Sequence, residues 1–412
     1  MFDVIKIWES NGPATLHFSH KDLPTKYKTK ILGAVIEDGP LVSSLWDSIQ
    51  NRQTQISSND ESRVHFLCPG ILEKINDPSE EQNESDPLSF TYVNKETKQS
   101  HTISTNLLVG ADGLNSSVRK LFGITTFQSD YGRRAVTCTV KMADSLNRTA
   151  FQRFFPNGPI ALLPIWSHDK EYDEPIYANI VWSTTPDHAI HLKNLSTSDF
   201  LHELNASLQV GPTQSPHLLQ PSLTSKFPSP IKNAVNGFEL LFQSMNQGLT
   251  MSHWAEDPSH SLFSIPPEII DVVGPRLSFD LKLSQAKQYV SKTNSSRAVL
   301  VGDAAHALHP MAGQGLNLGL GDVNILAQEI QKAVESGMDV GSSGSLFLKR
   351  YESQRQLASS VVMGGVQFLH TSFGLESGLG INVRSLGMNL IGANGLVRKK
   401  LAEVAAFGGG IL

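Results

Sequence analysis

The chain has 412 residues, of which 40% are hydrophobic and 18% are charged, and its formal net charge is −5. This composition excludes a disordered chain and leaves room for two domains. The acidic balance gives no basic footprint for nucleic acid, so nucleic acid is not expected as a partner. Cys68 and Cys138 are too few for a disulfide framework, and the apolar runs around them predict reduced core thiols of an intracellular protein.

The start of the chain predicts strands rather than a signal or transit peptide. Two alternating segments, Val4–Trp8 and Ala14–Phe18, flank the turn residues Asn11-Gly12-Pro13. This pattern predicts a β-hairpin that belongs to a mixed sheet. Apolar residues between Leu41 and Ile49 recur at helical spacing and predict one apolar helix face. Three further short strands are expected at Arg63–Leu67, Leu88–Val93 and His101–Ile103.

A first motif lies at Asn106–Phe122, which reads NLLVGADGLNSSVRKLF. A short apolar strand is followed by a Gly-Ala-Asp-Gly turn that contains Asp112. A helix is then expected to begin near Ser116, with Asn115 or Ser116 as its N-cap. Arg119 falls in that helix. Two interpretations stay open: Arg119 faces a ligand, or it pairs with Asp112 and only braces the turn.

A β-rich module follows this motif. Strands are expected at Ala135–Met142, Ala150–Phe155, Pro159–Pro164 and Ile176–Trp182. Because a second Gly–Asp motif comes after this module, a domain built from both motifs must be discontinuous. The residues from 185 to 295 have helical and Pro-rich character and carry no motif.

The second motif opens at Ala298–Val301, an apolar run that predicts a buried parallel strand. Gly302-Asp303 ends the strand, and helical spacing begins at Leu316. A carboxylate at this position can accept hydrogen bonds from sugar or ribityl hydroxyls. The free N–H groups at the helix start favour the binding of an anion. The Gly–Asp pair alone also fits an ordinary strand-to-helix crossover. His306 and His309 lack the neighbouring ligands that a metal site needs, so no metal is expected.

The full pattern GDAAHxxHPMAGQGLNxGxxD closely resembles the second flavin-contacting motif of the FAD-dependent aromatic hydroxylases, the family typified by para-hydroxybenzoate hydroxylase. GADGxxSxVR resembles the motif between that family's two flavin motifs, and FLKRYESQRQ resembles its C-terminal helix, expected here at 346–372. The runs QRFFPNGPIALLPI and VWST are similar to the ubiquinone-biosynthesis branch of the family and its bacterial ring-hydroxylating relatives.

The resemblance implies FAD as the cofactor, and it names no catalytic residue. Asp303 is expected at the ribityl or pyrophosphate portion, Pro310 against the isoalloxazine, and Gly313 to Asn317 along its pyrimidine edge. Asp112 and Arg119 match positions near the pyrophosphate that are tied to reduced-nicotinamide use. The cofactor-binding residues carried over in this way are Asp112, Gly113, Arg119, Gly302, Asp303, Pro310, Gly313, Gln314, Gly315, Leu316 and Asn317.

The implied activity is a monooxygenase that transfers oxygen from a flavin C4a-hydroperoxide to the ring of a polyprenylated phenol in ubiquinone biosynthesis. Pro159–Pro164 is the candidate wall that aims the ring. The electron donor is either ferredoxin with its reductase or NAD(P)H. The implied location is the matrix side of the mitochondrial inner membrane, as a peripheral protein in a ubiquinone-biosynthesis complex. Two alternatives stay open: a hydroxylase of a soluble aromatic substrate, and an inactive fragment that serves as an assembly or lipid-binding partner.

The expected fold is α/β, with a discontinuous Rossmann-like FAD-binding domain, an inserted mixed β-sheet substrate domain and C-terminal helices. Substrate-domain strands are expected at 1–40 and the main substrate domain at 126–296. The FAD-binding parts are expected at 41–125 and 297–335, and the C-terminal helical region at 336–412.

The family's first strand–GxGxxG–helix unit is not found in this sequence. We therefore expect an FAD-binding domain truncated at its N-terminus, which retains FAD weakly or not at all. The tail beyond Gly374, with Arg398-Lys399-Lys400, is expected to be a packed terminal helix or a membrane-surface contact.

Overall fold

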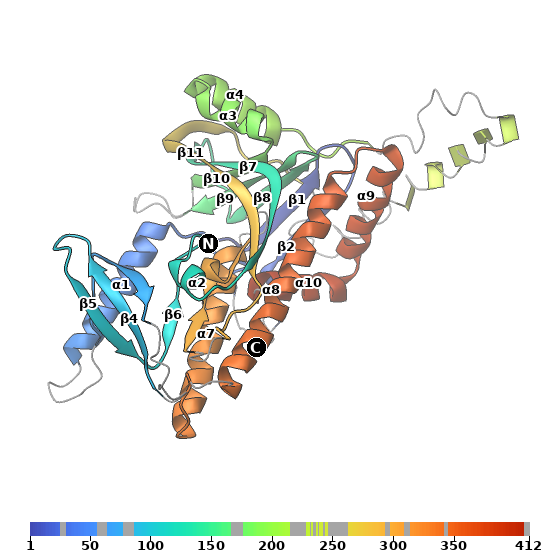
Figure 1. Ribbon diagram of the computed structural model, residues 1–412. Coiled ribbons are helices and arrows are strands. Elements are labelled where there is room, and N and C mark those ends of the chain that lie inside the picture. The colour runs from blue at the N-terminus through green and yellow to red at the C-terminus, as the bar shows by residue number, and fades with distance from the viewer. Residues whose placement is uncertain are drawn as a thin grey trace.

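The protein is described by a computed structural model. It covers residues 1–24, 30–55, 64–76, 86–165, 176–214, 263–292, 297–308, 314–341 and 345–407, with short pieces between 228 and 245. The largest element is a mixed sheet (Figure 1). Its strands are β1 (Val4–Glu9), β2 (Thr15–Ser19), β7 (Thr126–Met142), β8 (Thr149–Phe155), β9 (Gly158–Ile165), β10 (Tyr177–Thr184), β11 (Ile269–Ala286) and β13 (His306–Ala307). Their spatial order is β13-β11-β7-β10-β9-β8-β1-β2.

The first two strands form the predicted hairpin. β1 pairs antiparallel with β2 and parallel with β8, which makes the sheet mixed as expected. The turn requires Gly12, because a Cβ there would lie 2.2 Å from the carboxylate oxygen Oε1 of Glu9. That same oxygen accepts a hydrogen bond from the Ala14 amide at 2.9 Å and so closes the turn.

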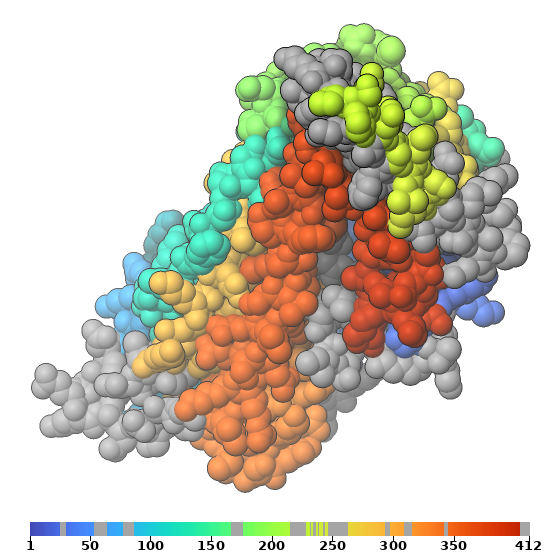
Figure 2. Space-filling view, turned by 90° about the vertical axis from the view of Figure 1, so that its right-hand side faces the viewer, coloured from blue at the N-terminus to red at the C-terminus, as the bar shows by residue number. Residues whose placement is uncertain are grey.

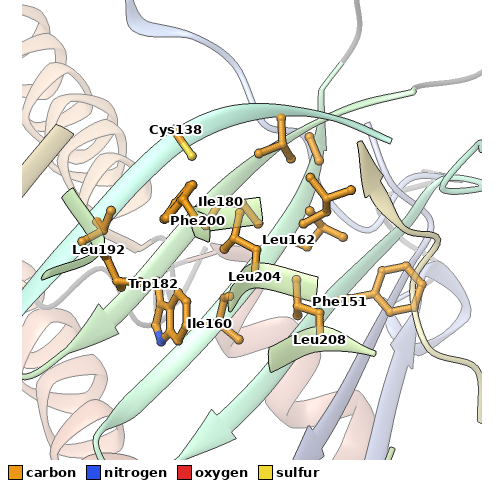
Figure 3. Packing of buried hydrophobic residues seen from close by; sticks show 14 of the residues in the cluster. Cys138, Phe151, Ile160, Leu162, Ile180, Trp182, Leu192, Phe200, Leu204 and Leu208 are labelled. Atoms are coloured by element: carbon orange, nitrogen blue, oxygen red, sulfur yellow. The ribbon is translucent and has the colours of Figure 1, made fainter. Parts of the chain in front are cut away.

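One face of the sheet is covered by α3 (Pro186–Asn194) and α4 (Thr197–Leu208). Every second strand residue points towards these helices, as the two-residue period of a strand requires. Cys138 of β7 is buried in this core, and burial raises the pKa of its thiol to about 12. Figure 3 shows the helix residues Leu192, Phe200, Leu204 and Leu208 packed over Ile160, Leu162, Ile180 and Trp182 of the strands.

The opposite side of the sheet meets the C-terminal helices α8 (Leu346–Phe373) and α9 (Gly378–Ala393) (Figure 1). Phe154 of β8 stacks on Phe373 with 4.0 Å between ring centroids. Arg384 of α9 forms an ion pair with the fully buried Glu9 of β1. The last helix, α10 (Gly395–Phe407), packs on α9, so the expectation of a packed terminal helix is confirmed.

Two smaller sheets complete the fold. β12 (Ala298–Leu300) pairs parallel with β6 (Leu108–Gly110). β3 (Gly70–Ile75), β4 (Leu88–Asn94) and β5 (Ser100–Thr105) form an antiparallel sheet. The helix predicted at Leu41–Ile49 is part of α1 (Asp38–Gln55), although its apolar face is largely exposed. No described helix combines the length and apolar character that a bilayer crossing needs.

The strand predicted at Arg63–Leu67 is wrong. Residues 64–68 have no regular secondary structure, and Arg63 lies outside the described residues. Cys68 is exposed, so the expectation of a core thiol also fails there. The apolar run VHFLC resembles a buried strand in sequence, but no neighbouring strand pairs with it among the described residues. A short apolar run gains burial only when a partner covers it.

Candidate functional site

The two Gly–Asp motifs meet at one edge of the β6–β12 pair. These strands run parallel, and the Val301 amide just after β12 donates to the Gly110 carbonyl at 3.0 Å. Gly110 permits the close approach, because a Cβ there would lie 2.8 Å from Leu300 and 2.9 Å from Val118. The carboxyl ends of parallel strands are where open α/β sheets bind ligands.

In the first motif, the Asp112 carboxylate accepts hydrogen bonds from the first amides of a helix. Its Oδ2 accepts from the amides of Ser117 at 2.6 Å and Val118 at 3.2 Å, which are the first residues of α2 (Ser117–Leu121). Ser116 is the N-cap, because its hydroxyl accepts from the Arg119 amide at 2.9 Å. Partial burial opposes ionisation of Asp112. Hydrogen bonds from Ser116, Val118 and Ser117 outweigh this effect and hold the pKa of the carboxyl below its ordinary value.

Arg119 joins the two motifs. Its buried guanidinium donates through Nη1 to the Ala304 carbonyl at 2.7 Å and through Nη2 to the Leu114 carbonyl at 2.6 Å. The side chain braces both motif loops, and its partners there are carbonyls rather than Asp112. A role of Arg119 towards a ligand stays a prediction.

Asp303 stands at the carboxyl end of β12. Gly302 has φ +58°, a backbone conformation that favours glycine, and it begins the 3₁₀ turn η4 (Gly302–Ala304). The Asp303 side chain is exposed, and no described residue forms a hydrogen bond with its carboxylate. Partial desolvation raises the pKa of the Asp303 carboxyl, while nearby His306 acts in the opposite direction. An exposed carboxylate at this strand end can accept a hydrogen bond from a ligand.

The helix α7 (Gln314–Glu335) begins at the glycine loop. Its first-turn amides have no acceptor within the helix, which is general for helix starts. Leu316 and Asn317 are exposed and Gly315 is half-buried, so the first turn is open to solvent. His309, Pro310 and Gly313 lie outside the described residues, as does the side chain of Gln314.

A buried network beneath these loops was not foreseen from sequence. The Asp322 Oδ2 atom accepts from the Gly302 amide at 2.8 Å and contacts His306 Nε2 at 2.7 Å. Its Oδ1 atom accepts from Arg355 Nε of α8 at 2.7 Å. Asp322 thus fixes the Gly302 turn, the β13 strand and α8 together. The signal was present, since Asp322 ends the quoted motif and Arg355 lies in the C-terminal pattern.

Two neighbours of Arg355 also brace the site. The Tyr351 hydroxyl donates to the Leu300 carbonyl at 2.6 Å, and burial raises the pKa of this phenol well above its ordinary value. The Glu352 carboxylate accepts from the Tyr289 amide at 2.7 Å. These contacts seat α8 against the end of β12. Two open cavities, of about 670 and 580 Å³, lie instead at the α9–α10 junction and along α1.

Comparison with known proteins agrees with this geometry. The FAD binding domain family matches residues 278–364, which span the second motif, α7 and most of α8. The chain is 31% identical over 371 residues to the mitochondrial ubiquinone biosynthesis monooxygenase COQ6 of Schizosaccharomyces pombe, covering 89% of this chain and 67% of that protein.

The chain belongs to the COQ6 family of ubiquinone biosynthesis monooxygenases. It is also 29% identical over 404 residues to the Dictyostelium discoideum COQ6, covering 95% of this chain and 71% of that protein. A solved structure, PqsL, a probable FAD-dependent monooxygenase from Pseudomonas aeruginosa, superposes with a TM-score of 0.57 at 15% identity. That superposition covers 94% of this chain and 80% of PqsL, and it supports the fold alone.

The predicted family, the α/β fold with a large mixed sheet and C-terminal helices, the monooxygenase class and FAD as the cofactor are thereby confirmed. The individual cofactor-binding residues stay predictions.

Proposed function

We propose that this chain is an FAD-dependent monooxygenase that hydroxylates the ring of a polyprenylated phenol in ubiquinone biosynthesis. The observation that carries the proposal is the meeting of the two motifs at one strand edge, where the exposed Asp303 lies close to His306 and η4 packs on α7. Family membership supports the reaction class, and the names of the relatives support the pathway.

The residues present fit FAD. The Asp303 carboxylate would accept from a ribityl hydroxyl, and the amides at Gly315, Leu316 and Asn317 would donate to a negative edge of the flavin. Glycine at 319 keeps α7 close to the loop, because a Cβ there would lie 3.3 Å from the Gly302 Cα. When bound, FAD supplies the oxygen-activating redox chemistry, so the protein need only bind, orient and exclude water.

The substrate wall is proposed on the sheet face opposite α3 and α4. The run Pro159–Pro164 lies in β9, where Ile160 and Leu162 point into the core. Alternation therefore places the apolar side chains of Ala161 and Leu163 on the opposite face. An apolar wall suits an aromatic ring and would limit water near it.

Membrane contact and electron supply are finer parts of the proposal. At the α9–α10 junction, the exposed side chains of Leu390, Leu396 and Val397 lie beside exposed Lys399 and Lys400. An apolar patch flanked by lysines suits a peripheral contact with an anionic bilayer. We place this contact at the matrix side of the mitochondrial inner membrane, within a ubiquinone-biosynthesis complex. Electrons come from ferredoxin and its reductase or from NAD(P)H.

The test is an oxygen-incorporation assay. The protein is incubated with FAD, ¹⁸O₂ and a prenylated 4-hydroxybenzoate, with NADPH in one arm and ferredoxin plus its reductase in the other. Mass spectrometry should find one ¹⁸O atom in the ring in one arm, with less product from the unprenylated compound. A protein that binds FAD and consumes the donor without hydroxylating any ring would contradict the proposal.

A further inference from the structure

The helix α1 lies on the surface with its apolar side uncovered. Four large apolar side chains recur at helical spacing along one side and are 37–62% exposed: Val42, Leu45, Trp46 and Ile49. Among the side chains of α1 that the structure describes, only Leu41 is even half-buried. None of the buried cores found in the described residues includes a residue of this helix. The described part of the chain therefore leaves the apolar side of α1 open to solvent.

The sequence of α1 makes it a weak helix on its own. Its 18 residues include Gly39 and three serines, Ser43, Ser44 and Ser48, which are poor helix formers. Isolated helices of this length are marginal in water, and most helices in proteins are stabilised by packing of an apolar face. The apolar side of α1 therefore needs a partner that covers it.

The uncovered surface continues onto the segment that follows α1 in the chain. The Trp46 and Phe66 rings lie 4.2 Å apart between centroids, with 42° between their planes. Phe66 is 40% exposed, and Val64 and Leu67 beside it are exposed as well. Contiguous apolar surface of this kind marks interaction sites, whereas single exposed apolar residues do not. We call this surface the α1 patch, made of Val42, Leu45, Trp46, Ile49, Val64, Phe66 and Leu67.

The charges around the patch separate the kinds of partner. Glu37 and Asp38 lie at the start of α1 and Asp47 lies on its far side, against a single basic residue, Arg52. Contact with an anionic bilayer requires Lys or Arg beside the apolar face. A lipid surface therefore fits the α1 patch poorly, and a protein surface fits it better.

The two ends of α1 are complementary to each other. Asp38 lies in the first turn and Arg52 in the last, and at 100° per residue both fall within or beside the apolar side. When two copies of the helix pack antiparallel with Leu45 at the crossing point, Val42 of one copy faces Ile49 of the other. The acidic start of each helix then lies beside Arg52 of the other, and the two helix dipoles are opposed. A second copy of this chain therefore satisfies both the apolar side and the charges.

The α1 patch lies apart from the other surface that we assign. Figure 1 shows α1 on one side of the molecule and the helices α9 and α10 on the other. Figure 2 views the molecule from that other side, where α8 and α9 form much of the surface. A contact through α1 therefore leaves the proposed membrane contact at the α9–α10 junction open in both copies.

We propose that the α1 patch is the interface of a homodimer, in which α1 packs antiparallel against α1 of a second copy about a two-fold axis. An interface built on one helix pair and a short segment is smaller than the roughly 1,600 Å² of a standard interface, so the dimer should dissociate on dilution. The inference does not depend on the proposed function, because it involves no residue of the two flavin motifs.

The test is sedimentation velocity of the purified full chain across a dilution series. Wild type should be a dimer when concentrated and a monomer when dilute. Leu45→Glu places two like charges at the crossing point and should weaken dimerisation by about a hundredfold or more. Ser44→Glu puts the same charge on the opposite side of α1 and should dimerise like wild type. Circular dichroism should show both variants folded, because neither side chain is buried in the monomer.

A charge exchange tests the antiparallel arrangement. Arg52→Glu and Asp38→Arg should each weaken the dimer by about tenfold or more, because like charges then meet at both ends of the helix pair. A mixture of the two variants should recover the dimer, because every end contact in the mixed pair joins opposite charges.

Wild type that stays monomeric when concentrated overturns the inference and leaves the α1 patch to a different partner. A dimer that L45E does not weaken also overturns it, because that dimer forms through another surface. A mixture of folded R52E and D38R that dimerises no better than either variant alone overturns the antiparallel pairing.

Discussion

Arg355 of α8 and Asp322 of α7 form a buried ion pair, with 2.7 Å between Nε and Oδ1 and almost no exposure of either side chain. The same guanidinium donates to the Leu318 carbonyl at 3.0 Å. Gly321 makes room for it, since a Cβ there would lie 2.8 Å from Arg355 Nη2. Because Asp322 also accepts a hydrogen bond from the Gly302 amide, this pair fixes the position of the Gly302–Ala304 turn, which carries Asp303.

Removal of Arg355 should therefore destabilise the protein strongly. In Arg355→Met, the Asp322 carboxylate stays buried without its cation, and the free energy of unfolding should fall by about 3–5 kcal/mol. Urea unfolding followed by circular dichroism measures this. Arg350→Met is the control, because Arg350 is exposed on the same helix and its loss should cost less than about 0.5 kcal/mol. A loss below about 1 kcal/mol for R355M would show that the pair is not needed.

Arg119 should matter for cofactor affinity as well as stability. Arg119→Gln removes the guanidinium contacts to the Ala304 and Leu114 carbonyls, which should cost about 2–3 kcal/mol of unfolding free energy. The Asp303 turn then loses its tie to α2, so FAD should bind more weakly. Lys120→Gln, at the exposed next position, should change neither quantity. Unchanged FAD affinity in a folded R119Q would argue against a positioning role.

Ionisation of the Asp303 carboxyl should lower the stability of the folded protein at neutral pH. Desolvation raises its pKa in the folded protein. The folded state then holds this proton more tightly than the unfolded state, so stability falls as pH rises through the interval above the ordinary carboxyl value. Asp303→Asn should thus be more stable than wild type at pH 7 and lose that advantage near pH 3. Thermal unfolding of both proteins between pH 3 and pH 7 measures this. A D303N protein less stable than wild type at pH 7 would contradict the prediction.

The ion pair between Glu9 and Arg384 should hold the C-terminal helices to the hairpin. Arg384→Met leaves the fully buried Glu9 without its cation, and about 3–5 kcal/mol of stability should be lost. Hydrogen exchange should speed up in α9 and in β1–β2 together. Lys399→Met removes an exposed charge nearby and should leave both rates unchanged. Faster exchange in α9 alone would mean that the hairpin does not depend on this contact.

The sequence predicted those parts of the site that local pattern encodes. The strand before Asp303 is a continuous apolar run, and the helix after the glycine loop has clear periodicity, so both could be placed. The partnership of Asp322 with Arg355 could not, because it joins residues 33 positions apart through the packing of two helices. The same holds for Arg119, whose acceptor at Ala304 lies 185 positions away.

The strand β11 shows a second limit. It spans Ile269–Ala286 but contains Gly274 with φ +90° and Pro275, residues that usually mark turns. In the structure they lie where the pairing register with β7 shifts, between Val273 and Leu277. Several of its apolar side chains, including Phe279, are exposed, so the alternation that marks a half-buried strand is weak. Pairing with β7 along most of its length, and with β13 at Ser284 and Gln285, defines this segment as a strand.

The most direct test of the account is a titration of FAD, followed by flavin fluorescence, into wild type and Asp303→Asn. We predict weak but saturable binding to wild type, as expected of the truncated domain, and binding weakened by a further factor of about ten or more in D303N, because a ligand hydroxyl loses a charged acceptor. Glu335→Gln, an exposed charge at the far end of α7, should bind FAD like wild type. Equal FAD affinity for D303N and wild type would contradict the account.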